Sequence, residues 1–350
     1  MTMDRFPHAI DTGAYHAGHI QGIALDAERG ILYCSYTQIL VKLDLQGNLL
    51  GSVTGLTGHL GCIEFNPDDG KVYGSLEYKN DAIGKGIRKF LGCEEKEAET
   101  SFYIAIFDVD KIDRVDMDAC ADGVMKTVYL REVVDDYNAA EENGREHRYA
   151  CSGIDGTSFG PRFGQTDGKR YLTVAYGIYG DVTRSDNDRQ VLLQYDISHW
   201  DSLAQPLNQD HFHKSGPASY DGKYFLHTGN TNWGVQNLQY DAGEARWLLF
   251  VYRGKKENYP NYPLYSVKAD APVAVNEVGE TCLTLERGGA YHEESGIGGW
   301  LFPRGAEGVV SFGNGYFYVS HPFRTEDGRS SSVVRLCQRT DGAEFMKVLE

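Results

Sequence analysis

A strand–turn–strand unit that recurs along the chain restricts the possible folds more than any other feature. Each copy is a β-rich run, a short turn and a second β-rich run, and Gly preceded by Asp or Asn in the turn is a strong hairpin signal. Five copies are evident, and their hairpins lie at residues 19–36, 59–78, 155–176, 234–252 and 307–320. A third strand is expected after each hairpin, at 40–45, 103–108, 191–196, 264–268 and 332–336.

Fourth strands are expected at 126–130, 281–285 and 345–349. Repeated units of four antiparallel strands are the blades of a β-propeller, so we predict an all-β chain with one propeller domain over residues 1–350. The segment before His19 is expected to add an outer strand to the last blade and close the ring. Degenerate blades have room near 200–230 and 285–303, and charged insertions are expected at about 79–101 and 131–150.

The composition agrees with a β-rich fold and disfavours several classes of partner. The chain has 41 Gly in 350 residues, where average usage of ~7% would give about 25. The formal net charge of −16 argues against nucleic acid and anionic membranes as partners. The first residues lack a basic segment followed by an apolar one, so we expect a cytoplasmic protein. Seven scattered cysteines without a CxxC pair indicate free thiols rather than a zinc ribbon or a disulfide framework.

Propeller geometry predicts where a site would lie. Inner strands begin, and second strands end, on the same face near the central channel. The starts of the inner strands supply His19, Gln21, His59, Asp155, Trp233, Gln236, Arg304 and Glu307. The ends of the second strands supply Tyr36, Tyr78, Lys79, Tyr176, Tyr179, Tyr252, Arg253, Lys255, Lys256, His321 and Arg324. An acidic chain therefore gathers basic and aromatic side chains around one mouth.

Each of these residues alone also has a structural explanation. Tyrosine packs at the strand ends of any sheet, lysines solvate loops, and His19 or His59 can hydrogen-bond a neighbouring blade. Their convergence favours a binding site over these explanations. His227 lies on a strand that leads towards the same rim and is a further candidate.

The predicted mouth suits a sugar that carries a carboxylate, because aromatic rings stack on sugars and Arg pairs with carboxylates. The reaction that follows is β-elimination from a uronic acid: a cation neutralises the carboxylate, and a neutral His or a Tyr removes the C5 proton. A glycosidase with two carboxylates would have only Asp155 and Glu307 as inner-ring candidates. Zinc-type clusters and nucleotide motifs are not evident, so no cofactor is expected, and a structural calcium ion stays open.

Several segments resemble the propeller enzymes that remove α-L-rhamnose caps linked to glucuronic acid in arabinogalactan and gum arabic, a group related to ulvan lyases. The segments are HIQGIA (19–24), LTGHLGC (56–62), GSLEYK (74–79), TGNTNWGVQNLQYD (228–241) and GYFYVSH (315–321). The resemblance implies a seven-bladed propeller, from which the five clear repeats depart. It also implies either elimination by a rhamnose–glucuronate lyase or hydrolysis by an α-L-rhamnosidase, and His19 matches the unusual catalytic histidine of the hydrolases.

The preferred hypothesis is elimination at the rhamnose-α-1,4-glucuronate linkage of an anionic oligosaccharide, and hydrolysis with His19 is the alternative. Candidate catalytic residues are His19, His59, Tyr176 and Arg304, the last three by position alone. Candidate substrate-binding residues are Gln21, Lys79, Arg162, His227, Trp233, Arg253, His321 and Arg324. A calcium-dependent lactonase and a non-catalytic binding propeller remain as further alternatives.

Overall fold

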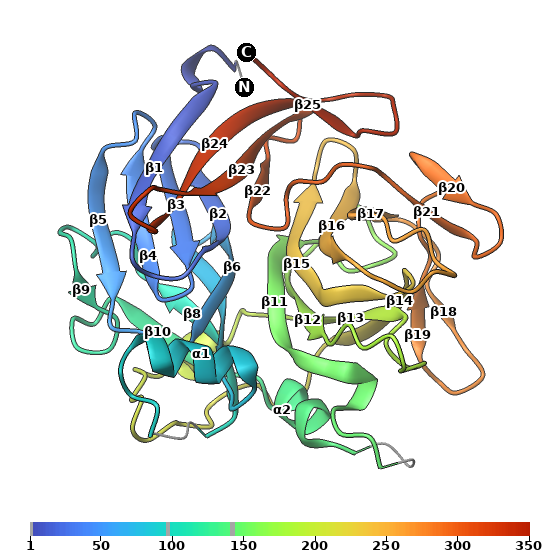
Figure 1. Cartoon of the computed structure of the whole chain (residues 1–350), viewed down its shortest axis with the longest axis horizontal. Coiled ribbons are helices and arrows are strands. Elements are labelled where there is room, and N and C mark those ends of the chain that lie inside the picture. The colour runs from blue at the N-terminus through green and yellow to red at the C-terminus, as the bar shows by residue number, and fades with distance from the viewer. Residues whose placement is uncertain (1–2, 96–98, 141–143) are drawn as a thin grey trace.

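Five antiparallel sheets surround a central axis as the blades of a β-propeller (Figure 1). The computed structural model describes residues 3–95, 99–140 and 144–350. The predicted all-β fold is therefore confirmed, and so is the number of repeats counted in the sequence. The seven blades implied by the resemblance are wrong, because the strands of the described residues are used up by five blades and a small hairpin.

The strands of the first two blades follow one another outward from the channel, apart from the short β9, which returns to the first blade. The first blade consists of β2 (Ile20–Asp26), β3 (Ile31–Tyr36), β4 (Ile39–Asp44) and β5 (Leu49–Thr54), with the short β9 (Met117–Asp118) parallel to β5. The second consists of β6 (His59–Asn66), β7 (Lys71–Tyr78), β8 (Ser101–Phe107) and β10 (Met125–Tyr129).

The segments that follow residue 268 contribute to the third blade and also contact the fourth. The third blade consists of β11 (Cys151–Gly160), β12 (Tyr171–Ile178), β13 (Arg189–Tyr195) and β14 (Gly222–His227), extended by β19 (Thr281–Leu283) and β18 (Ala274–Val275). The fourth consists of β15 (Thr231–Asp241), β16 (Arg246–Arg253) and β17 (Leu264–Lys268). The segment 281–285, expected as the fourth strand of the fourth blade, instead runs parallel to β14 of the third blade.

The last blade is closed by the two ends of the chain. It consists of β22 (Val309–Ser311), β23 (Tyr316–Arg324) and β24 (Ser330–Arg339), with both β1 (Ala9–Tyr15) and β25 (Met346–Val348) paired to β24. Figure 1 shows the two ends of the chain next to each other, and His8 Nδ1 lies 2.6 Å from the carbonyl oxygen of Glu350. The predicted closing strand before His19 is confirmed.

The segments proposed as degenerate blades do not form blades. Residues 222–227 are the fourth strand of the third blade, and residues 285–303 hold only the hairpin of β20 (Ala290–His292) and β21 (Ile297–Gly299). The helical elements are η1 (Met3–Arg5), α1 (Ala82–Phe90), α2 (Arg131–Asn138), η2 (Arg148–Ala150) and η3 (Trp200–Ser202). Both α-helices lie in the predicted insertions, whose residues 96–98 and 141–143 fall outside the described part of the chain. In that part, no helix is long and apolar enough to cross a membrane.

The hairpin turns follow the glycine pattern of the sequence. Gly70 and Gly168 have φ values of +70° and +95°, and a Cβ atom at either position would meet nothing within 4 Å. There is room for a side chain, so the left-handed backbone is what requires glycine at these turns. All seven cysteines are free, as predicted.

A polar plug closes the channel between the inner strands. The Asn237 side chain donates to the carbonyl oxygens of Gln21 (2.8 Å) and Ala306 (2.7 Å). The thiol of Cys62 donates to Asn237 Oδ1 (3.3 Å). The Asn237 amide thus joins its own strand β15 to β2, to β6 and to the segment before β22, which belong to four blades, and separate cavities remain above and below it.

Candidate functional site

The upper cavity, of about 430 Å³, lies where the inner strands begin. It brings together six of the residues predicted from the sequence: His19, Gln21, His59, Lys79, Trp233 and Arg324. Asp155, Gln236 and Tyr252 of the predicted mouth also line it, and Tyr252 donates to Glu307 Oε1 (2.9 Å). The cavity therefore lies on the face of the propeller, and at the strand ends, where the sequence predicted a site.

Two of the predicted catalytic residues lie outside this cavity. Tyr176 is fully buried and donates to Asp136 Oδ2 (2.7 Å), so its hydroxyl has no access to a substrate. Side chains along a strand alternate between its two faces, and Tyr176 faces the packed layer between blades. Arg304 and His321 belong to the last blade and do not line the cavity. Burial lowers the pKa of His321, and the charge of Arg304 lowers it further.

Three predicted binding residues are also elsewhere. Arg162 lines a groove beside the third blade and donates to the carbonyl oxygen of Asp221 (2.9 Å). His227 is exposed at the end of β14. Arg253 is exposed at the end of β16 and donates to the carbonyl oxygen of Asn261 (2.8 Å). These side chains occupy the rims of their blades and do not reach the channel.

Glu77 is the principal cavity residue that the sequence analysis did not select. It precedes Tyr78 on β7, a strand that is buried almost throughout. The alternation of strand side chains places Ser75, Glu77 and Lys79 on one face, and this periodicity would have pointed to Glu77. The Glu77 and Lys79 side chains are only 2% and 3% exposed, and they form an ion pair of 2.6 Å between Oε1 and Nζ.

This buried ion pair is held by backbone groups on both sides. Lys79 Nζ also donates to the carbonyl oxygen of Ser152 (2.5 Å), and Glu77 Oε2 accepts the N–H of Ile154 (3.2 Å). A Cβ atom on Gly153 would lie 2.0 Å from Glu77 Oε2, so this position needs glycine. Burial raises the pKa of Glu77, and the charge of Lys79 opposes that shift.

His59 lies next to the Glu77–Lys79 ion pair. Its Nδ1 atom is 3.6 Å from Glu77 Oε1 and makes no hydrogen bond with any described residue. Burial, followed by the charge of Lys79, lowers the pKa of His59 to about 3. The imidazole is therefore neutral near pH 7. His19 is neutral there as well, because burial and then Arg324 lower its pKa, and its Nδ1 lies 3.4 Å from Gln21 Nε2.

The depressed pKa of His59 predicts a specific pH dependence of stability. In the unfolded chain the ring gains a proton as pH falls below about 6.5, whereas the folded protein resists protonation until about pH 3. The unfolded state binds more protons in this window, so His59 contributes stability that is lost as pH falls from 6.5 towards 3. Urea unfolding across this range should show a shallower pH slope for His59→Gln than for the wild type, and equal slopes would contradict the burial of a neutral ring.

Asp155 supplies a second carboxyl group to the cavity. Its Oδ2 accepts a hydrogen bond from Gln236 Nε2 (2.9 Å). Burial, and then the charge of Glu77, raise the pKa of Asp155 well above its usual value. The environment of Asp155 therefore favours the protonated form of its carboxyl, beside neutral histidine rings, and such a group can act as a proton donor.

Trp233 forms an aromatic wall on a strained segment. Its φ of +69° is left-handed, which is costly for a residue with a side chain and typical of functional positions. Its ring meets Tyr179 at a centroid distance of 5.8 Å, and its carbonyl oxygen accepts from Gln236 Nε2 (2.9 Å). Tyr179 thus packs against the ring, and Gln236 anchors the backbone that carries it.

Helix α1 forms the opposite wall, and Asp81 fixes where it begins. The Asp81 carboxylate accepts the N–H groups of Ile83 (3.0 Å) and Gly84 (2.9 Å), and it also accepts the Tyr179 hydroxyl (3.1 Å). Ile83, Ile87 and the 58%-exposed Phe90 line the cavity from this helix. The first insertion therefore contributes an apolar side to the site.

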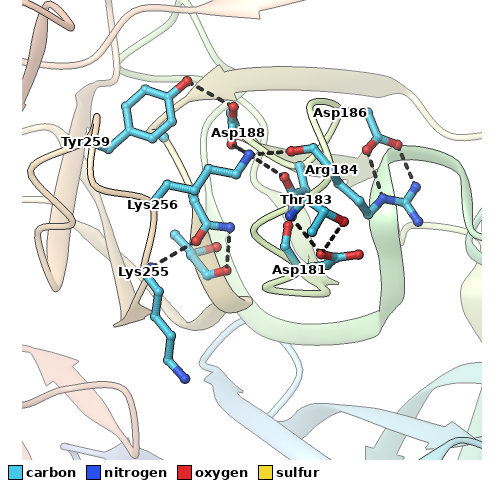
Figure 2. A network of polar contacts seen from close by, with 12 residues as sticks. Asp181, Thr183, Arg184, Asp186, Asp188, Lys255, Lys256 and Tyr259 are labelled. Atoms are coloured by element: carbon cyan, nitrogen blue, oxygen red, sulfur yellow. Dashed lines mark hydrogen bonds and ion pairs between the residues drawn. The ribbon is translucent and has the colours of Figure 1, made fainter.

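The loop that carries Tyr179 is held by the polar network in Figure 2. Lys256 Nζ donates to the Arg184 carbonyl (2.6 Å) and to Asn187 Oδ1 (2.9 Å), and it forms an ion pair with Asp188. Asn187 in turn donates to the carbonyl oxygen of Tyr179 (2.9 Å). Lys256 thus joins the third and fourth blades structurally.

Replacing Lys256 by methionine should destabilise the protein by about 1–3 kcal/mol, because three acceptors lose one buried donor. Chemical denaturation measures this change. Lys255→Met is the matched control, since the Lys255 side chain is exposed and extends away from the network (Figure 2). The control should change the free energy of unfolding by less than ~0.5 kcal/mol, and equal losses in both variants would refute the assignment.

Among the described residues, no group of three or more His, Cys, Asp or Glu side chains is placed to hold a metal ion. No protein-family model matches the chain, and no curated protein matches it. Among solved structures, the chain is similar to a GH43 β-1,3-galactosidase with galactodeoxynojirimycin. The identity is 11%, the TM-score is 0.43, and the match covers 97% of this chain and 98% of that chain. A likeness this distant carries no information about the reaction.

Proposed function

We propose that the protein is a carbohydrate-active enzyme that cleaves a uronic-acid-containing oligosaccharide in the upper cavity by β-elimination. The observation that carries the proposal is that one cavity holds a neutral His59, 3.6 Å from Glu77, together with the Asp155 carboxyl, whose pKa is raised by burial. Elimination needs a proton acceptor and a proton donor at the same time, and the unprotonated ring of His59 and the Asp155 carboxyl are the proposed pair. A ring with a pKa of about 3 is a weak base, so its role as acceptor depends on Glu77, whose carboxylate stabilises the imidazolium. The substrate that we propose is the rhamnose-α-1,4-glucuronate linkage.

Arg324 is the proposed partner of the substrate carboxylate. It is an exposed residue that lines the cavity, whereas the ammonium group of Lys79 is already engaged by Glu77 and the Ser152 carbonyl. A guanidinium beside the uronate carboxylate makes the C5 proton more acidic. Trp233 offers a ring on which the sugar can stack.

In the reaction, the imidazole of His59 takes the C5 proton. The electron pair of that C–H bond forms the C4=C5 double bond, and the bond from C4 to the leaving oxygen breaks. Asp155 gives its proton to that oxygen. Glu77, 3.6 Å from His59 Nδ1, stabilises the imidazolium that forms. Tyr252 is not assigned as a base, because burial raises its pKa and its hydroxyl donates to Glu307.

Hydrolysis by an α-L-rhamnosidase is the second candidate. The observation that favours it is that two carboxyl groups, Glu77 and Asp155, line the same cavity, and glycoside hydrolysis uses a pair of carboxyls in different protonation states. In this alternative His19 is the catalytic histidine. The two reactions release the same rhamnose and differ in what remains of the uronate.

The deciding experiment uses an oligosaccharide capped with rhamnose on glucuronic acid. Ultraviolet absorbance of the unsaturated uronate and release of free rhamnose are followed together. Rhamnose with the chromophore supports elimination, and rhamnose without it supports hydrolysis. If neither signal appears, the proposed linkage is wrong. Loss of activity on chelation would instead favour a calcium-dependent lactonase.

A further inference from the structure

A second cavity, of about 720 Å³, lies at the other end of the central channel. The upper cavity is lined by residues where the inner strands begin, such as His59 and Gln236, whereas this lower cavity is lined by residues near their ends, such as Glu64 and Gln239. The Asn237 plug separates the two. The proposed reaction makes no use of the lower cavity.

Strand β15 supplies a glutamine to each cavity, and each glutamine meets a carboxyl group from another strand, Asp155 of β11 or Glu64 of β6. At the top, Gln236 Nε2 donates to the buried carboxyl of Asp155 (2.9 Å). Three residues further along, Gln239 Nε2 lies 3.4 Å from Glu64 Oε2, which also accepts the Ser158 hydroxyl (3.2 Å). Burial raises the pKa of Glu64 to about 7, so this carboxyl exchanges its proton near neutral pH.

The lower cavity also contains an unsatisfied acceptor. Gln239 is 6% exposed, and its Oε1 atom has no hydrogen-bond partner among the described residues. A buried acceptor without a donor costs free energy. The Oε1 atom is itself shielded from solvent, so a ligand hydroxyl would relieve that cost once the Gln239 amide turns towards the cavity. This orphaned atom is the sign that the cavity suits a polar occupant.

Aromatic rings and two arginines complete the lining. Phe65, Phe159, Tyr240 and Phe312 line it, and the Arg170 guanidinium lies 5.5 Å from the Phe159 ring centroid. Arg29 lies there as well, paired with Asp26 and Asp110. The arginines would repel a cationic ligand, and the carboxylates would repel an anionic one. A purely apolar ligand would leave Gln239 Oε1 without a hydrogen-bond donor.

We propose that the lower cavity binds a neutral polyhydroxylated ring, such as a pyranose, with its face on the aromatic side chains and a hydroxyl donating to Gln239 Oε1. Hydroxyl groups both donate and accept, so one sugar satisfies Gln239 and Glu64 as acceptors and the arginines as donors. This binding site is independent of the reaction proposed for the upper cavity.

The test measures binding of three neutral probes, the methyl pyranosides of glucose, galactose and rhamnose, by ligand-observed NMR at millimolar concentration. At least one should bind the wild type. Gln239→Leu should weaken that binding about tenfold, which corresponds to the loss of one hydrogen bond to a buried group. Phe312→Ala, at a partly exposed ring, should weaken it too, and thermal unfolding confirms that both variants fold.

Gln236→Leu is the matched control, because it makes the same change on the same strand at the upper cavity. Binding unaffected by Gln236→Leu and weakened by Gln239→Leu supports the proposal. Binding lost only in Gln236→Leu places the sugar in the upper cavity alone and overturns it. Absence of binding by all three probes, or binding unchanged in both Gln239→Leu and Phe312→Ala, also overturns it. Each result is read without reference to catalysis, so failure of the proposed elimination would leave it intact.

Discussion

Replacing His59 by glutamine is expected to lower the kcat of uronate elimination by about two to four orders of magnitude, the usual contribution of a positioned general base. Glutamine keeps the approximate size and polarity of the ring but cannot accept the C5 proton. The effect should fall on kcat more than on KM, since Arg324 and Trp233 remain to hold the sugar. The rate of appearance of the unsaturated uronate measures it directly.

His211→Gln is the control for this prediction. His211 is an exposed loop residue outside the upper cavity, so its replacement should leave the rate unchanged. A His59→Gln enzyme that keeps the wild-type rate would remove His59 from the mechanism. If His19→Gln then abolished rhamnose release, the hydrolytic alternative would take its place.

Replacing Lys79 by methionine is expected to destabilise the protein by about 3–5 kcal/mol, because the substitution leaves Glu77 as an uncompensated buried charge. The ammonium group also satisfies the Ser152 carbonyl, which would lose its donor. Equilibrium denaturation at neutral pH measures the change. A loss below ~1 kcal/mol would be typical of a solvated surface pair and would contradict the burial of this one.

The pH dependence of the Lys79→Met variant identifies the cause. Without the cation, the pKa of Glu77 in the folded state should rise further above its unfolded value, since the charge of Lys79 is what opposes the effect of burial. A carboxyl with a raised folded pKa contributes stability below its unfolded pKa and loses it as pH rises. The deficit should therefore shrink towards acidic pH. The double variant Glu77→Gln/Lys79→Met, which removes both charges, should be more stable than Lys79→Met at neutral pH.

The sequence predicted the fold well because the signals of a propeller are local. Gly70 and Gly168 mark hairpins through backbone conformation alone, and β-rich runs on either side set the strands. The parallel pairing of residues 281–283 with β14 joins segments that are far apart in the sequence, so a local pattern placed residues 281–285 in the wrong blade.

The site was predicted only in part for the same reason. Position along the strand identified the face of the propeller, and His59 and Lys79 follow from it. Whether a side chain at a strand end points into the channel depends on which of the two faces of the strand it occupies. Glu77 lies on the face that lines the cavity, whereas Tyr176 lies on the face that packs between blades. The pKa values of His59 and Asp155 depend on burial, which no local pattern specifies.

The pairing of β1 with β24 determines when the upper cavity becomes complete during synthesis of the chain. His19 follows β1 directly, and Arg324 lies at the end of β23, so two walls of one cavity come from opposite ends of the chain. A ribosome delivers the N-terminal blades first, and those blades hold His59, Glu77 and Lys79 without the rim that faces them. A nascent chain of these blades therefore has the proposed base but neither Asp155 nor an enclosed cavity. The catalyst proposed here would become competent only after release of the last strand, which makes activity a sensitive report of complete synthesis.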